Sequence, residues 1–211
     1  MKITKFEHAC FVVEQDGENL VVDPGGWTTN LVVPNNVVAI VITHAHPDHI
    51  DPKHLAAIVA QNPDAMIIAH DSVTSQLQDF KTQPVVANEG IKVGHFELEF
   101  FGGQHATISP DIPAIANLGV MINETIYYPG DSFALPDDRK VAILALPVAA
   151  PWMKFSEAAE FVKMLRPSMI FPTHDAILSP AGKSLADIMV GRVADAVGSD
   201  YQRIDDTPIE A

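Results

Sequence analysis

Short apolar runs of strand length alternate along this chain with amphipathic segments, and this alternation limits the folds that it can adopt. The run from Val37 to Thr43 is almost wholly apolar, which predicts a strand that is buried on both faces. Asp51 and Pro52 then form a typical helix start, and apolar residues follow at helical spacing. Because strands and helices that alternate in this way pack in layers, the sequence predicts an α/β fold.

The remaining elements are expected from the same patterns. The turn residues 15–18 predict a hairpin, and Ser72 is expected to cap a second helix. No repeat or flexible linker divides the chain, so we expect one domain over residues 1–211, with a loose tail at 201–211. Strands are expected at 10–14, 19–23, 37–43, 66–69, 91–93, 96–101, 118–122, 125–128, 141–146 and 169–171, and further helices at 156–165 and 179–198.

Charge and composition exclude several classes of protein. The 27 acidic and 13 basic side chains give a formal net charge of −14, which argues against a broad basic surface for nucleic acid. With Cys10 as its single cysteine, the chain can form neither a disulfide framework nor a multi-cysteine zinc ribbon. The sequence after Met1 does not resemble a secretory signal, and no apolar run approaches the ~18 residues that cross a bilayer. We therefore expect a cytoplasmic protein without nucleic-acid or membrane partners.

The segment Thr43-His44-Ala45-His46-Pro47-Asp48-His49 directly follows the most apolar expected strand. Its imidazoles and carboxylate are ligand types that suit zinc, iron or manganese. In an extended or tightly turning segment, His44 and His46 project to the same side and can bind one ion, whereas Asp48 and His49 lie past the bend and can face a second. A polar turn with surface histidines is the alternative interpretation, and the position after a buried strand favours the metal site.

This spacing resembles the metal-binding signature of the metallo-β-lactamase superfamily, and other residues agree with it in order. The resemblance implies an αββα four-layer sandwich and two divalent ions, zinc above all, with manganese or iron as options. It implies that Asp23 orients ligands without binding metal itself, and that Asp131 bridges the two ions and acts in catalysis with Asp48. The implied ligands are His44, His46 and His105 for the first ion, and Asp48, His49 and His174 for the second.

The position of these residues supports the same assembly. His44, His105, Asp131 and His174 each follow an expected strand, and a sheet sandwich that places these strand ends at one edge would bring them into one cleft. Each has a plainer interpretation as well: His105 as a loop histidine, Asp131 as part of a Pro-Gly-Asp-Ser turn and His174 as a cap.

Four further residues are weaker candidates. The segment Glu7-His8-Ala9-Cys10-Phe11 resembles the start of the ascorbate-6-phosphate-lactonase-like branch, which implies a catalytic role for His8, although Glu7 replaces the usual glycine. His70 is a candidate for substrate contact or a satisfied core histidine, and Lys154 is a candidate anion contact or an exposed lysine before a helix. The acid that protonates the leaving group is unassigned among His8, His70 and Asp175.

These expectations indicate a hydrolase that uses metal-activated water on an ester, lactone or phosphoester of a small molecule. Because the metal ions carry positive charge, the substrate can be anionic. A small-substrate phosphodiesterase or nuclease, and a non-catalytic metal-binding module, are the alternatives. Assembly into a homo-oligomer, which is frequent among relatives, stays open.

Overall fold

The computed structural model describes residues 1–204 and 207–211, and its strands form two sheets of seven strands each. The first sheet has the spatial order β14 (Ile209–Glu210), β1 (Lys2–Lys5), β2 (Phe11–Gln15), β3 (Glu18–Val22), β4 (Val37–Ile42), β5 (Met66–Ala69) and β6 (Thr82–Pro84). The second has the order β13 (Asp200–Tyr201), β12 (Met169–Thr173), β11 (Ile143–Pro147), β10 (Ile126–Tyr128), β9 (Leu118–Ile122), β8 (Phe96–Gly102) and β7 (Gly90–Val93).

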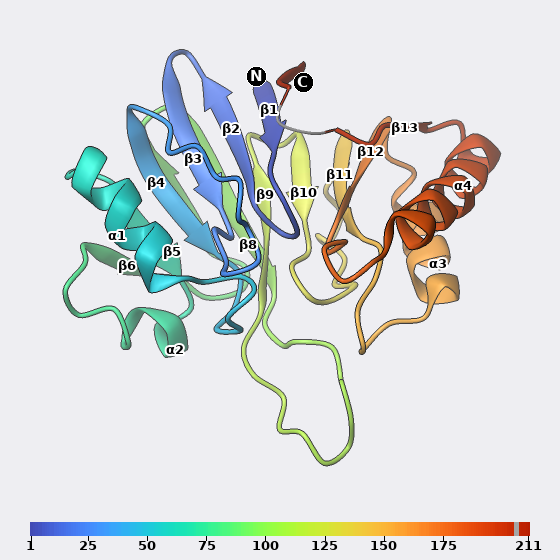
Figure 1. The fold of residues 1–211 in the computed structure, drawn as a ribbon, viewed down its shortest axis with the longest axis horizontal. Helices are drawn as coiled ribbons and strands as arrows, with labels where there is room; N and C mark the ends of the chain where they lie inside the picture. Colours follow the sequence, from blue (N-terminus) through green and yellow to red (C-terminus); the bar gives the residue numbers. More distant parts are fainter. Residues whose placement is uncertain (205–206) are drawn as a thin grey trace.

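Helices cover the outer face of each sheet, as Figure 1 shows. The helices α1 (Pro52–Gln61) and α2 (Asp71–Thr74) lie outside the first sheet, and α3 (Phe155–Leu165) and α4 (Pro180–Val197) lie outside the second. The layers therefore follow the order helix, sheet, sheet, helix, and the expected αββα sandwich is confirmed. Among the described residues, none of the helices combines the length and apolar character that crossing a membrane would need.

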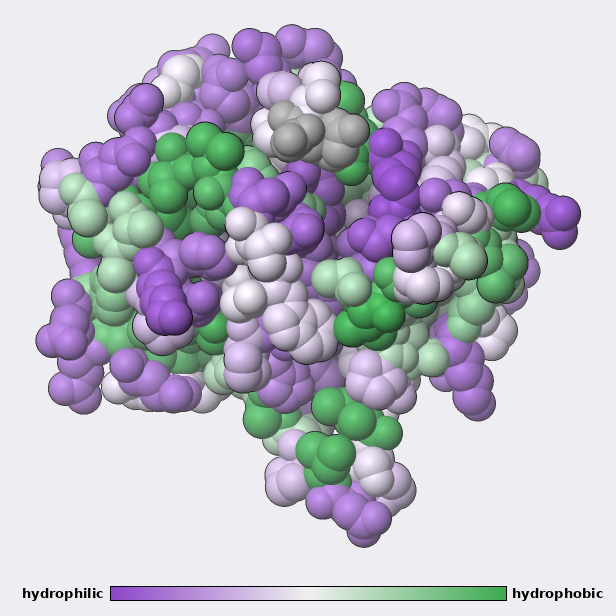
Figure 2. Space-filling model, in the orientation of Figure 1, coloured by the Kyte–Doolittle hydropathy of each residue, from purple (hydrophilic) through white to green (hydrophobic). Residues whose placement is uncertain are grey.

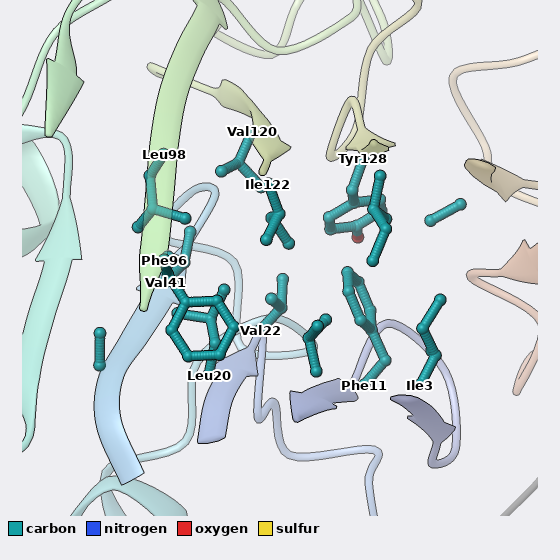
Figure 3. Packing of buried hydrophobic residues seen from close by; sticks show 14 of the residues in the cluster. Ile3, Phe11, Leu20, Val22, Val41, Phe96, Leu98, Val120, Ile122 and Tyr128 are labelled. Carbon is teal, nitrogen blue, oxygen red and sulfur yellow. The ribbon is translucent and has the colours of Figure 1, made fainter. Parts of the chain in front are cut away.

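The core consists of three apolar clusters that the alternation of strand side chains separates. In β4, Val41 points between the sheets whereas Ile40 packs under α1, and in β12 Phe171 and Ile170 divide in the same way. Figure 3 shows the central cluster, in which Phe11 of the first sheet faces Tyr128 of the second, with ring centroids 5.5 Å apart. Burial on both faces explains why β4 has an almost unbroken apolar sequence.

Most elements begin and end within two residues of their expected positions, and Asp51 caps α1 by accepting the Lys53 N–H at 2.8 Å. The expected helix at Ser72 is wrong in its cap and its length, because His70 caps α2 and the helix ends at Thr74. The apolar side chains of Leu77 and Phe80 reach the core from turns instead. The pattern did not reveal the short strands β1, β6, β13 and β14, the last of which pairs with β1 at the other end of the sequence.

The expected loose tail is also wrong for the described residues of that segment. Tyr201 in β13 pairs with Ile170, and Glu210 in β14 pairs with Lys2 of β1. Ile204 is buried in the central core. The C-terminal residues thus contact both sheets, and residues 205 and 206 lie outside the described part of the chain.

Glycine is required where the loop after β3 crosses the loop after β4. An added Cβ at Gly25 would lie 1.8 Å from the backbone oxygen of Asp48, and the neighbouring Gly26 N–H donates to Pro47 O at 2.8 Å. Any larger residue at position 25 must displace the backbone that carries Asp48 and His49. The close approach of these two loops therefore sets the position of the histidine motif.

We expect Gly25→Ala to lower the free energy of unfolding by about 1–3 kcal/mol, the usual cost of forcing extra volume into a packed site. Gly191→Ala is the matched control, because Gly191 lies within α4 and an added Cβ there meets nothing within 4 Å. It should stabilise the protein by about 0.5–1 kcal/mol through helix propensity. Urea denaturation measures both, and equal stability of Gly25→Ala and the wild type would contradict the packing described here.

Candidate metal centre

Loops at one edge of the two sheets bring the sequence motif and its distant partners together. Asp23 follows β3, the motif 44–49 follows β4, His105 follows β8, Asp131 follows β10 and His174 follows β12. His8 joins them from the loop between β1 and β2. Residues separated by more than 100 positions thus meet because the strands that precede them end at the same edge.

The ligand atoms fall into three groups, within each of which all atoms lie within 4.8 Å of one another. The expected ligands of the first ion form one group, and those of the second ion form another that also contains His8. The third group contains Asp131 and shares a histidine with each of the others, so Asp131 lies between them. The groups are His44, His46 and His105; His8, Asp48, His49 and His174; and His44, His49 and Asp131.

Hydrogen bonds on the outer side of the cluster fix the histidine rings. Nδ1 of His105 donates to the backbone oxygen of Ala106 at 2.6 Å, and Nδ1 of His174 donates to Ala149 O at 2.6 Å. Nδ1 of His49 lies 2.7 Å from a carboxylate oxygen of Asp23. An imidazole that donates through Nδ1 keeps its other nitrogen as a lone-pair acceptor, which is the usual state of a metal-binding histidine.

The inner atoms of the same residues have no hydrogen-bond partner. Among the described residues, six buried side-chain polar atoms are unpaired, and four of them belong to this cluster. A buried polar atom without a partner costs free energy, so four in one place require a ligand that accepts lone pairs. The donor set of imidazoles and carboxylates fits a divalent ion. The four atoms are Nε2 of His49, His105 and His174, and Oδ1 of Asp131.

Asp23 lies outside the ligand groups and holds the start of the loop after β4 in place. Its carboxylate is fully buried and accepts the Thr43 N–H at 2.8 Å and the Thr43 hydroxyl at 2.7 Å, in addition to the His49 contact. The hydroxyl of Thr43 also lies 3.0 Å from Nδ1 of His44. Asp23 therefore orients two histidines and does not itself face the centre of the cluster.

His8 is completely buried and contacts Asp48 directly. Its Nδ1 accepts the Ala176 N–H at 3.3 Å, which leaves the proton on Nε2, 3.0 Å from Oδ2 of Asp48. Burial lowers the pKa of His8 to about 4 despite this carboxylate, so the ring is neutral at pH 7. In this arrangement His8 is a hydrogen-bond donor that orients Asp48.

The protonation states of the cluster reflect burial and the closeness of opposite charges. Burial lowers the pKa of His44 well below its usual value. Burial alone would raise the pKa of Asp131, but the nearby His49 holds it well below its usual range. Burial would also lower the pKa of His174, yet the nearby carboxylates of Asp131 and Asp48 raise it to about 9. The metal-free cluster thus keeps ionised carboxylates between histidines.

A cavity of about 270 Å³ opens onto the cluster. The loop of residues 103–117 contributes to its wall; it projects from the body in Figure 1 and carries apolar side chains in Figure 2. Trp27 and Ile177 at the rim are 45% and 49% exposed. Apart from the proposed metal-binding residues, the cavity is lined by Trp27, Pro47, Ile108, Pro151, Trp152 and Ile177.

Three of the weaker candidates lie elsewhere. His70 caps α2 and hydrogen-bonds to Ser72, and Lys154 caps α3, with its backbone N–H donating to Glu157 at 2.7 Å. Asp175 forms ion pairs with Arg203 and Lys183. None of the three lines the cavity described above. A substrate contact by His70 or Lys154 in this cavity therefore has no support: in each case the helix begins earlier than expected, and the residue stands at its N-cap.

Two residues that the sequence did not single out hold Asp131 from behind. Buried Asn117 accepts the Asp131 N–H at 2.9 Å, and the indole Nε1–H of Trp152 donates to Oδ2 of Asp131 at 2.7 Å. Asn117 directly precedes β9, and Trp152 lies in the loop after β11, two positions before Lys154. A polar-tipped aromatic residue just beyond a buried strand was the available signal.

Comparisons with known proteins agree with this architecture. The family model of the β-lactamase superfamily domain matches residues 2–174. The protein Rv0786c of Mycobacterium tuberculosis is 32% identical over 207 residues, covering 96% of this chain and 95% of that protein. A UPF0173 metal-dependent hydrolase of Carboxydothermus hydrogenoformans is 25% identical over 193 residues, covering 82% and 84%.

The fold has solved counterparts as well. The structure of Igni18, a metallo hydrolase from Ignicoccus hospitalis, superposes with a TM-score of 0.77 at 19% identity and covers 100% of this chain and 98% of that one. This likeness extends over both sheets and concerns the fold alone. Together with the family match, it confirms the resemblance seen in the sequence: the chain belongs to the metallo-β-lactamase superfamily.

Proposed function

We propose that this protein is a metal-dependent hydrolase that holds two divalent ions and acts on an uncharged ester or lactone of a small molecule. The main support for the metal site is the set of four buried, unpaired atoms at the sheet edge. The hydrolase class is supported by the printed name of the Carboxydothermus hydrogenoformans relative. The apolar lining of the cavity supports an uncharged ester or lactone.

The two ions are assigned by the groups of ligand atoms. His44, His46 and His105 would hold the first ion, which suits zinc because all three ligands are imidazoles. Asp48, His49 and His174 would hold the second, with Asp131 shared between the two. A carboxylate in the second set makes manganese or iron acceptable there, so zinc is the first choice and not the only one.

Two ions at these positions would acidify water to produce a nucleophile at neutral pH and would polarise the bond under attack. The residues of the chain prepare the site for this chemistry. His8 fixes Asp48 through a hydrogen bond of 3.0 Å, and Asp23 fixes His49 through one of 2.7 Å. Trp27, Ile108 and Ile177 give the cavity an apolar wall.

The cavity favours an uncharged substrate. Among the described residues, no lysine or arginine lines it, and its walls away from the cluster are aromatic, aliphatic or proline side chains. A phosphoester would gain no cationic partner from the protein beyond the metals, whereas an ester or lactone could place its apolar part against Trp27 and Ile108. The anionic substrate for which Lys154 was a candidate contact is therefore the weaker option.

The wild-type protein is expected to bind two zinc ions per chain, and His105→Ala is expected to lose at least one. Exposed His95 is the matched control, because His95→Ala removes a histidine at the entry of β8, outside the ligand groups. Metal content after dialysis measures the effect. Removal of metal should also lower the melting temperature, since an ion at 1,000 times its Kd stabilises a fold by about 4 kcal/mol. Equal metal content in both variants would contradict the site.

Activity is expected on lactones and carboxylic esters in a screen that also contains phosphodiesters, phosphomonoesters and thioesters, each with zinc and with manganese. Asp131→Asn should abolish the activity by removing the shared ligand, while Asp71→Asn, an exposed change at the start of α2, should not alter it. Hydrolysis of phosphodiesters alone would favour the phosphodiesterase alternative. Metal binding without activity on any class would favour a binding module. Either of these two results would contradict the proposal.

A further inference from the structure

Trp152 lies between the candidate metal centre and Phe133, which packs on Phe161 of α3. It follows β11, is 9% exposed and donates its indole N–H to Oδ2 of Asp131 at 2.7 Å. Its ring packs edge-on against Phe133, with centroids 5.2 Å apart, and lies near His105 at 6.2 Å. The indole is therefore held in place by packing on one side while its N–H reaches the cluster on the other.

Trp152 differs in one respect from the histidines that surround Asp131. The Nε2 atoms of His174, His49 and His105 lie 3.1, 3.3 and 3.4 Å from the Asp131 carboxylate. Each of these nitrogens would turn its lone pair to a metal ion once one is bound. An indole nitrogen is a donor only and binds no cation, so its hydrogen bond is compatible with both the metal-free and the metal-loaded protein.

The backbone of Asp131 is fixed separately and does not settle the direction of its carboxylate. Its N–H donates to Asn117 and its carbonyl oxygen accepts the Ala106 N–H at 2.9 Å. Rotation of the carboxylate about its last side-chain bond would turn the plane of its two oxygens away from the cluster, since such terminal torsions are broad. The bond from Trp152 restrains this rotation because it holds one of the two oxygens, Oδ2, at a fixed place.

We propose that Trp152 is the positioning residue for the shared carboxylate: its N–H holds Oδ2 of Asp131 beside His105 and His174, so that the unpaired Oδ1 faces His49. This inference rests on the proposed metal site. Under this inference Trp152 supports metal binding through its N–H, in addition to lining the cavity with its ring.

The second tryptophan provides a matched control within the same cavity. Trp27 also lines the cavity and packs edge-on against His8, with centroids 4.7 Å apart, but within the described residues its indole makes no side-chain hydrogen bond. If tryptophan serves only as apolar wall, the loss of the N–H should be silent at both positions. If Trp152 positions Asp131, the loss of the N–H should change metal binding only at position 152.

The test compares Trp152→Phe, Trp27→Phe and a protein with β-(3-benzothienyl)alanine at position 152, which keeps the shape of the indole and replaces its N–H by sulfur. Zinc is titrated calorimetrically into each metal-free protein, and the visible spectrum of the cobalt-loaded form reports the ligand geometry. Both changes at position 152 should weaken the weaker zinc site about 10–100-fold, the usual effect of removing a group that orients a ligand. Both should also shift the cobalt bands, and Trp27→Phe should do neither.

Wild-type zinc affinity and an unchanged cobalt spectrum in the benzothienylalanine protein would overturn the inference while leaving the metal site intact. Equal losses at positions 27 and 152 would overturn it as well, since they would indicate an effect of cavity packing. A wild-type protein that binds no zinc or cobalt would overturn the proposed function itself, and this inference with it.

Discussion

The buried carboxylate of Asp23 is the interaction on which the site depends most. It accepts two hydrogen bonds from Thr43, at the end of β4, and lies 2.7 Å from His49, so one anion connects β3, β4 and the histidine motif. A fully buried carboxylate is tolerated only when several donors satisfy it. Because those donors belong to Thr43 and His49, the contacts that satisfy Asp23 also orient the motif.

The rest of the site consists of buried acceptor atoms without partners at the edge of a well-packed sandwich. The central core, with Phe11 against Tyr128 and Phe171, stabilises a fold that leaves four inner polar atoms unpaired. His8, Asp23 and His174 also have positive backbone φ, which is uncommon for residues other than glycine. Local costs of this kind gather at functional sites, where a bound ligand offsets them.

The sequence predicted the layers and the cluster well because both depend on local signals. The motif places four chemically distinctive residues within 44–49, and the other proposed ligands stand just after strands that apolar runs reveal. Residues whose roles depend on distant partners were missed. Trp152 is recognisable only through Asp131, and β14 only through its pairing with β1. His70 and Lys154 stand at N-caps because both helices begin earlier than the apolar pattern indicates.

The central claim is that two metal ions share this cluster, and anomalous diffraction from crystals grown with zinc tests it most directly. Data on both sides of the zinc absorption edge should show two peaks about 3.5–4 Å apart, the usual spacing of paired catalytic ions. One peak should lie beside His44, His46 and His105, and Asp131 should contact both. A single peak, or peaks only at the protein surface, would contradict the account.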